Sequence, residues 1–181
     1  MKIRLELLPL CVLAVSVGVA QVPAGPAAPA VPARFPPATD AAARGPSIAL
    51  ALEAAQAALA TCSAQGAHIA ATVVDSVGVI KVQLVDDAAN KRSMMTSTAK
   101  AMAASEYRMP SSELAEKIKT DTALAEKVKA NLNIDAGSGA LPMMVGGEVI
   151  GAIGVGGGRG SRTQDEDCAR AGLEKVKSRL R

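Results

Sequence analysis

The chain of 181 residues carries 20 Lys and Arg against 17 Asp and Glu, a formal net charge of +3, and only 1% of its residues are aromatic. So small a positive excess, with so few rings for base stacking, argues against a nucleic-acid-binding protein. Residues 47–181 suffice for one compact domain with a sizeable core, which must be packed with aliphatic and methionine side chains.

Residues 1–20 have the organisation of a secretory signal peptide. Basic residues near the start precede an apolar run that ends at Val19, and small residues precede a cleavage site after Ala20. Pro9 interrupts this run, which is short for a membrane-spanning helix of roughly 20 residues. We therefore expect a mature protein that has no membrane span and is periplasmic or secreted.

Residues 21–46 form a Pro/Ala-rich segment that contains seven of the ten prolines. Such a composition buries too little apolar surface to offset the entropy of ordering, and it favours extended polyproline conformations. We expect a disordered tether, which is either a spacer that holds the domain away from the cell surface or an unstructured mature N-terminus.

Residues 47–85 predict a helix followed by a β-hairpin. Ser47 can cap the helix, and Gly66 ends it. The expected apolar stripe of this helix consists of Ile48, Leu52, Ala55, Leu59 and Cys62. Two strands, residues 69–75 and 79–85, should follow, and the first is apolar enough to be buried on both faces.

Three further helices are expected before the second hairpin. The first covers residues 93–106, and its inward face should hold Met94, Thr98, Ala101, Met102 and Ser105. Ser111 and Thr120 are the expected caps of two shorter helices. Their inward residues should be Leu114 and Ile118 in one helix, and Leu124, Val128 and Leu132 in the other.

The C-terminal part predicts a second hairpin and a closing helix. Val145 and Val149 flank Gly146-Gly147, a dipeptide that tolerates the positive φ of tight hairpin turns. The closing helix should cover residues 163–180, with Ala169, Leu173, Val176 and Leu180 inward. The order of these elements predicts an α/β (α+β) fold with a central antiparallel sheet of two hairpins flanked by helices.

Five segments of the domain carry the motifs of one known family. They are HIAATVVDSVGVIKVQLVDD (68–87), SMMTSTAKAMAAS (93–105), MPSSELAEK (109–117), LPMMVGGEVIGAIGV (141–155) and QDEDCARAGLEKV (164–176). Together they resemble the GlcG/HbpS-like haem-binding proteins, which include the C-terminal domain of the PduO adenosyltransferases. The resemblance implies a three-layer α-β-α domain that assembles into homo-oligomers, and it implies haem as a cofactor.

The cysteines predict a disulfide. Cys11 leaves with the signal peptide, so the mature chain keeps Cys62 and Cys168. An even count in an exported protein favours a bridge between them. Two buried thiols are the alternative.

His68 is the single histidine, so any metal centre or catalytic triad would depend on it. His68 is the candidate axial haem ligand, and a solvated residue at a strand end is the alternative. Haem-binding members of the family that the chain resembles often carry a histidine just before the lysine-bearing helix, where this chain has Asn90, Lys91 and Arg92. Tyr107 or a methionine could complete the coordination, although core filling explains the methionines as well. The candidate methionines are Met94, Met102 and Met143. Arg92 could pair with haem propionates or another carboxylate, or belong to a solvated basic face.

Lys100 lies off the apolar stripe of its helix and corresponds to the lysine of the family motif. It could form a buried ion pair with Asp75 or Glu166, which would mark a site, or it could be an exposed surface lysine. The glycine run at residues 156–160 lacks the spacing of phosphate-binding loops. We expect this loop to permit close backbone approach, with Asp165 at the rim of a ligand site.

Two classes of function follow. The first is a secreted, non-catalytic haem-binding or haem-sensing module. The second is a small-molecule binding protein, or an accessory subunit of an enzyme of glycolate or diol utilisation, with its ligand held by Lys100, the glycine loop and Asp165. An envelope scaffold without a ligand is a third reading. The residues favour a binding protein over an enzyme, because the sequence has a single histidine on which a catalytic set could be built.

Overall fold

The computed structural model describes residues 43–161 and 163–181. The expected signal peptide (residues 1–20) and most of the expected tether (residues 21–46) lie outside the described residues. The last residues before the first helix contact the domain. The backbone N–H of Ser76 donates to the carbonyl of Arg44 at 2.9 Å, and the Arg44 guanidinium pairs with Glu148.

Four strands form one antiparallel sheet in the order β2-β1-β4-β3. The strands are β1 (Ala70–Asp75), β2 (Ile80–Val85), β3 (Ala140–Val145) and β4 (Glu148–Gly156). Each hairpin supplies two neighbours, and β1 joins the hairpins by pairing antiparallel with β4. The predicted α+β fold with an antiparallel sheet is confirmed, as is the burial of the whole of β1.

Both hairpin turns follow from their sequences. In the first, Asp75 Oδ1 accepts hydrogen bonds from the backbone N–H groups of Val77 and Val79, at 3.1 and 2.9 Å. In the second, Gly146 and Gly147 have φ of 58° and 86°, the left-handed conformation that the predicted Gly-Gly turn requires. Asp75 is therefore part of a turn and does not pair with Lys100.

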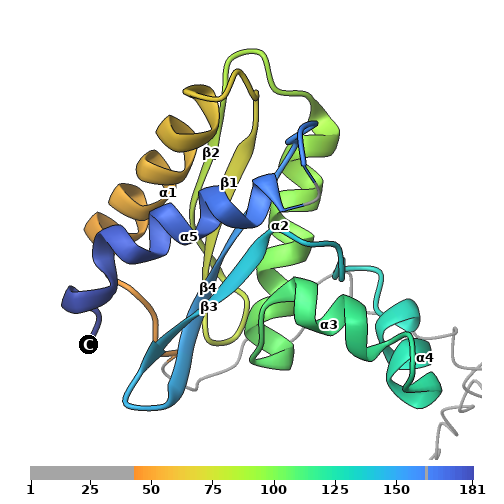
Figure 1. Ribbon diagram of the computed structural model, residues 1–181. Helices are drawn as coiled ribbons and strands as arrows, with labels where there is room; N and C mark the ends of the chain where they lie inside the picture. The colour runs from red at the N-terminus through yellow and green to blue at the C-terminus, as the bar shows by residue number, and fades with distance from the viewer. Residues whose placement is uncertain (1–42, 162) are drawn as a thin grey trace, which may run out of the picture. The chain divides into compact units, whose positions relative to one another are not determined.

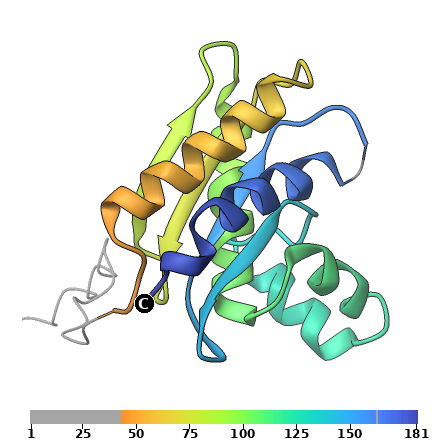
Figure 2. The ribbon, with the colours of Figure 1, turned by 60° about the vertical axis from the view of Figure 1, so that its left-hand side comes forward.

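Helices cover both faces of the sheet (Figures 1 and 2). On one face lie α1 (Ile48–Ser63) and α5 (Gln164–Val176), which pack side by side; α5 continues into a short 3-10 turn (Lys177–Arg179). On the other face lies α2 (Lys91–Tyr107), followed by α3 (Ser111–Lys117) and α4 (Thr122–Ala130). None of the described helices is both long enough and apolar enough to cross a membrane.

The face under α1 and α5 holds the main apolar core. The fully buried residues of α1 are Ala51, Ala54, Ala55, Ala58 and Cys62. The predicted stripe was wrong at its first two positions, because Ile48 and Leu52 are 57% and 37% exposed. Alanines lie against α5 in their place because small side chains let the two helices approach closely.

The face under α2 is built from smaller and more polar residues. A Cβ at Gly154 would lie 2.3 Å from the carbonyl oxygen of Ser97, so the backbones of β4 and α2 meet there directly. Thr72 on β1 shares a hydrogen bond of 2.8 Å with Ser97 Oγ on α2. Gln83 on β2 donates to the hydroxyls of Thr72 and Thr98, at 3.0 and 2.6 Å.

Several helix boundaries differ from their predictions. α2 begins at Lys91, ahead of the predicted start at Ser93, and Asn90 is its N-cap, since the Asn90 side chain accepts from the Ser93 N–H at 3.1 Å. Asp121 caps α4 in place of Thr120. Ser111 is the first residue of α3, and its hydroxyl accepts from the Ala140 N–H at 2.9 Å. Leu132 lies beyond α4 and is 93% exposed, so its predicted inward position was wrong.

Candidate functional site

Two adjoining clefts lie at the end of the sheet where β4 runs into the glycine loop. The histidine cleft has a volume of about 390 Å³ and is lined by Gln65, Gly66, Ala67, His68, Ala88, Asn90, Gly157, Arg159, Gly160 and Gln164. The lysine cleft, of about 800 Å³, is lined mainly by α2, α3, the segment 135–138 and the glycine loop. They share Asn90, Gly157 and Arg159, so the two form neighbouring parts of one depression.

His68 lines the histidine cleft, and its imidazole ring is held in one orientation. Its Nδ1 lies 2.8 Å from Asp86 Oδ1, while 58% of the side chain is exposed. An ionised carboxylate only accepts hydrogen bonds, so Nδ1 carries the proton, and Nε2 of the neutral ring keeps its lone pair. A histidine held by a carboxylate in this way is the usual arrangement of an imidazole that ligates a metal.

Asp86 is itself held in place. Its carboxylate accepts from the Ala88 N–H at 3.0 Å and from Ser63 Oγ at 3.3 Å, in addition to His68. The backbone N–H of Ala88, followed by the hydrogen bond from His68, keeps the pKa of Asp86 below its usual value. The carboxylate therefore stays ionised at neutral pH and keeps the imidazole in one orientation.

The glycine loop and the start of α5 form the opposite wall of the histidine cleft. The backbone N–H of Gly158 donates to Asp165 Oδ1 at 2.7 Å, and that of Gly160 donates to Gln164 Oε1 at 2.8 Å. Gln164 also reaches across the cleft to Gln65, with 3.1 Å between the side-chain amides. Two amides of the loop are thus bonded to the side chains that open α5.

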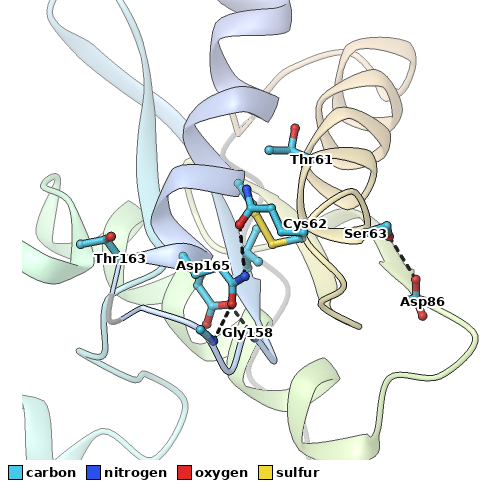
Figure 3. Close-up of a disulfide and its surroundings, with 12 residues drawn as sticks. Thr61, Cys62, Ser63, Asp86, Gly158, Thr163 and Asp165 are labelled. Carbon is cyan, nitrogen blue, oxygen red and sulfur yellow. Dashed lines mark hydrogen bonds between the residues drawn. A yellow bond between two sulfur atoms is a disulfide. The ribbon is translucent and has the colours of Figure 1, made fainter.

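A disulfide ties the two walls together (Figure 3). It joins Cys62, at the end of α1, to Cys168 in α5, with their Cα atoms 5.7 Å apart. The predicted pairing is confirmed. Residues Gln65–His68 follow Cys62 in the chain, and Gln164 precedes Cys168 in α5. The bridge therefore fixes the spacing of the two segments that border the histidine cleft.

Lys100 forms a buried ion pair at the floor of the lysine cleft. Its side chain is 10% exposed, and Nζ lies 2.7 Å from Asp165 Oδ2 and 3.3 Å from the Val155 carbonyl oxygen. Of the two predicted states, the structure has the buried pair. The partner is Asp165 and neither Asp75 nor Glu166, whose carboxylate instead binds Ser138 and Arg170.

Arg92, the predicted partner for a ligand carboxylate, lines the lysine cleft, whereas the candidate methionines lie away from both clefts. Met94 and Met102 line an open groove on the outer side of α2, of about 490 Å³, which we call the methionine groove. It is lined by Ile80, Gln83, Met94, Met95, Thr96, Thr98, Ala99, Met102, Leu132 and Asn133. Met143 is fully buried in the core under α1 and α5.

Tyr107 also lies elsewhere, in a shallow hollow between α2 and α4. Desolvation, followed by the charge of Glu106, raises the pKa of its phenol above the usual value. The raised pKa disfavours the phenolate that would bind iron. Within residues 43–161 and 163–181, no three His, Cys, Asp or Glu side chains gather closely enough to hold a metal ion together.

A family model described as "Haem degrading protein HbpS-like" matches residues 47–174. The chain belongs to the HbpS-like family. HbpS from Streptomyces reticuli, crystallised as a double mutant, is 32% identical with a TM-score of 0.66, and the match covers 82% of this chain and 97% of HbpS. A search of curated protein sequences gave no match.

Two further solved structures share the architecture. ORFY from Klebsiella pneumoniae is 25% identical with a TM-score of 0.69, covering 80% of this chain and 98% of ORFY. PduOC, solved as a complex with haem, is 20% identical with a TM-score of 0.66, covering 73% of this chain and 95% of PduOC. At that identity, PduOC shows the fold alone.

Sequence reasoning missed two residues that shape the clefts of this HbpS-like domain. Asp86 is not identified from the sequence, although the hairpin register pairs Ala70 with Val85 and so places Asp86 opposite Ile69, next to His68. The sequence places Arg159 within the glycine loop, and the structure shows that it borders both clefts. The hairpin register could have found Asp86. The position of Arg159 depends on how the loop folds over β4, which the sequence does not encode locally.

Proposed function

We propose that the protein is an exported, homo-oligomeric haem-binding module that is not itself a catalyst. The observation that carries the proposal is the Asp86-oriented imidazole of His68 at the edge of a cleft. Membership of the HbpS-like family, and the fold shared with PduOC, which was solved with haem, support the haem-binding part of the proposal.

The residues of the histidine cleft fit the chemistry of haem. Haem bound there would offer an iron centre that an imidazole nitrogen can ligate. His68 provides Nε2, and its ring is oriented by Asp86. Three of the ten described residues that line the cleft are glycine and two are alanine, which lets a flat ring approach the backbone, and Arg159 supplies a cation for a propionate.

The methionine groove fits haem less well. It offers thioether sulfurs and a more apolar surface, but none of the described residues that line it is a histidine or a cation. A haem there would have neither an imidazole ligand nor a partner for its propionates. We therefore place haem in the histidine cleft.

Haemin titration followed by the Soret band tests this proposal. We expect a saturable shift of the Soret band at one haemin per chain. The affinity should be roughly tenfold weaker in His68→Ala and unchanged in the matched control Met102→Leu. A band that stays constant for hours after a reductant is added in air agrees with a module that does not degrade haem, and a steady loss of the band would contradict it. Equal affinity of His68→Ala and the wild type would refute the assignment.

Export and assembly are part of the proposal. The signal-peptide pattern of residues 1–20 and the Cys62–Cys168 bridge support an oxidising compartment outside the cytosol. Exposed apolar residues around the edge strand β2 support a surface that a second copy covers, since Ile80, Met95 and Leu132 are 45%, 57% and 93% exposed. Intact mass would give a mature chain starting at Gln21, and light scattering would give a multiple of its mass.

A further inference from the structure

We infer that the lysine cleft is a second binding site, separate from the haem site, for a small hydroxylated carboxylate such as a sugar acid. The cleft has a volume of about 800 Å³, within the usual range for small-molecule pockets. The inference rests on the floor, the rim and the walls of this cleft; Arg159 borders both clefts, so Lys100 and Arg92 carry the inference when haem occupies the neighbouring cleft.

The floor offers a buried, charged donor. The ammonium group of Lys100 has three N–H groups, of which Asp165 and the Val155 carbonyl accept two. The side chain is nine-tenths buried and borders the cleft, and no described residue accepts the third N–H. Asp165 is fixed in turn by the Gly158 N–H, so the ammonium is held rigidly with one donor left for a ligand.

The rim adds positive charge. Arg92 and Arg159 line the cleft, and no carboxylate among the described residues lies within ion-pairing distance of either guanidinium. Lys119 also lines it, but its ammonium is paired with Glu116 at 2.6 Å. Two unpaired guanidinium groups above a buried ammonium suit a carboxylate, which guanidinium can bind with two parallel hydrogen bonds.

The walls select for a hydroxylated ligand. They carry the hydroxyl groups of Ser93, Thr96, Ser112, Ser138 and Thr163. Asp135 adds a carboxylate that can accept from a ligand hydroxyl, and one of its oxygens already binds the Gly137 N–H at 2.7 Å. Among the described lining residues, Ala115 alone has an apolar side chain, so the cleft suits a polar ligand and does not suit a porphyrin ring.

Calorimetric titration of the protein with gluconate, glycerate, sorbitol and inorganic phosphate tests the site. We expect at least one of the two hydroxy acids to bind at one per chain, sorbitol to give no signal for want of a charge, and phosphate to bind far more weakly. Binding of phosphate as tight as that of the acids, or no binding of either acid, would overturn the inference.

Variants locate the binding. Arg92→Gln should weaken hydroxy-acid binding by roughly ten- to a hundredfold, the usual effect of losing a hydrogen bond to a charged group. Arg179→Gln is the matched control, because it makes the same charge change at the C-terminal turn, where Arg179 pairs with Glu53 of α1. Equal affinities of these two variants would contradict the inference.

Lys100→Met should abolish the binding while haemin binding persists, which separates this site from the proposed haem site. Wild-type affinity for the acids in a folded Lys100→Met protein would contradict the inference. This variant leaves Asp165 without its cation and can lose its fold. In that event Arg92→Gln decides the test, because the Arg92 side chain is exposed and has no ion-pair partner among the described residues.

Discussion

The two faces of the sheet are built on different principles. Under α1 and α5 the packing is apolar, with rows of alanine set against Ile153 and Val155 of β4 and with a disulfide between the helices. Under α2 the sheet contributes Thr72, Gly154 and Gly156 to the interface. The helix contributes hydroxyl groups and Lys100.

The difference separates stability from ligand chemistry. The apolar face gains from burial and from the covalent link, and its buried cluster consists of alanine, valine, isoleucine, leucine, methionine and cysteine side chains. The α2 face buries polar groups, and every buried side-chain polar atom among the described residues has a hydrogen-bond partner. This packing places Lys100 at the floor of the lysine cleft. The following predictions test this division from its largest expected effect to its smallest.

Replacing both half-cystines, in a Cys62→Ala and Cys168→Ala double variant, should have the largest effect on stability. The bridge spans 106 residues, and a closed loop of that length is worth about 4 to 5 kcal/mol in the chain-entropy account. Urea unfolding of the oxidised wild type and the variant measures the difference. A loss below about 1 kcal/mol would show that the bridge adds little to the apolar face.

Thr72→Val should cost less, about 1 to 2 kcal/mol, because it takes a hydrogen-bond partner away from both Ser97 and Gln83 in a buried network. Thr61→Val in α1 is the matched control, since the Thr61 hydroxyl bonds only the Ala57 carbonyl of its own helix. Urea midpoints compare the two variants. Equal losses would mean that the α2 network has no special place in the fold.

Asp86→Asn should change how stability depends on pH. Because hydrogen bonds lower the pKa of Asp86 in the folded state, its contribution is present above the unfolded value of 3.8 and is lost as the pH falls through the lower folded pKa. The variant should therefore unfold with a shallower dependence on pH below about 4. Asp87→Asn, at the exposed neighbouring residue, should keep the steeper wild-type curve.

The fold was predictable because its signals are local. The Gly146-Gly147 turn and the largely apolar β1 each identify their element from neighbouring residues, and hairpins dictate antiparallel pairing. The inward face of α1 was less predictable. Alanine occurs around most of that helix, so the pattern alone favours the larger Ile48 and Leu52, whereas close packing against α5 selects the alanines.

The site was predictable only in part. His68 could be chosen because it is the single histidine, and the family motif pointed to Lys100. The partner of Lys100 lies 65 residues away in sequence, and helix periodicity gives no information at that range. Met94 and Met102 were grouped with His68 by composition, but the rotation of α2 directs them to a separate groove.

The most direct test of where haem binds is a map of backbone amide shifts in the labelled protein on addition of gallium protoporphyrin, a diamagnetic substitute for haemin. The account predicts that the largest changes occur at Gly66, Ala67, Ala88 and Gly157, around His68. Changes centred on Met95, Ala99 and Leu132 would place the porphyrin in the methionine groove and would contradict the account.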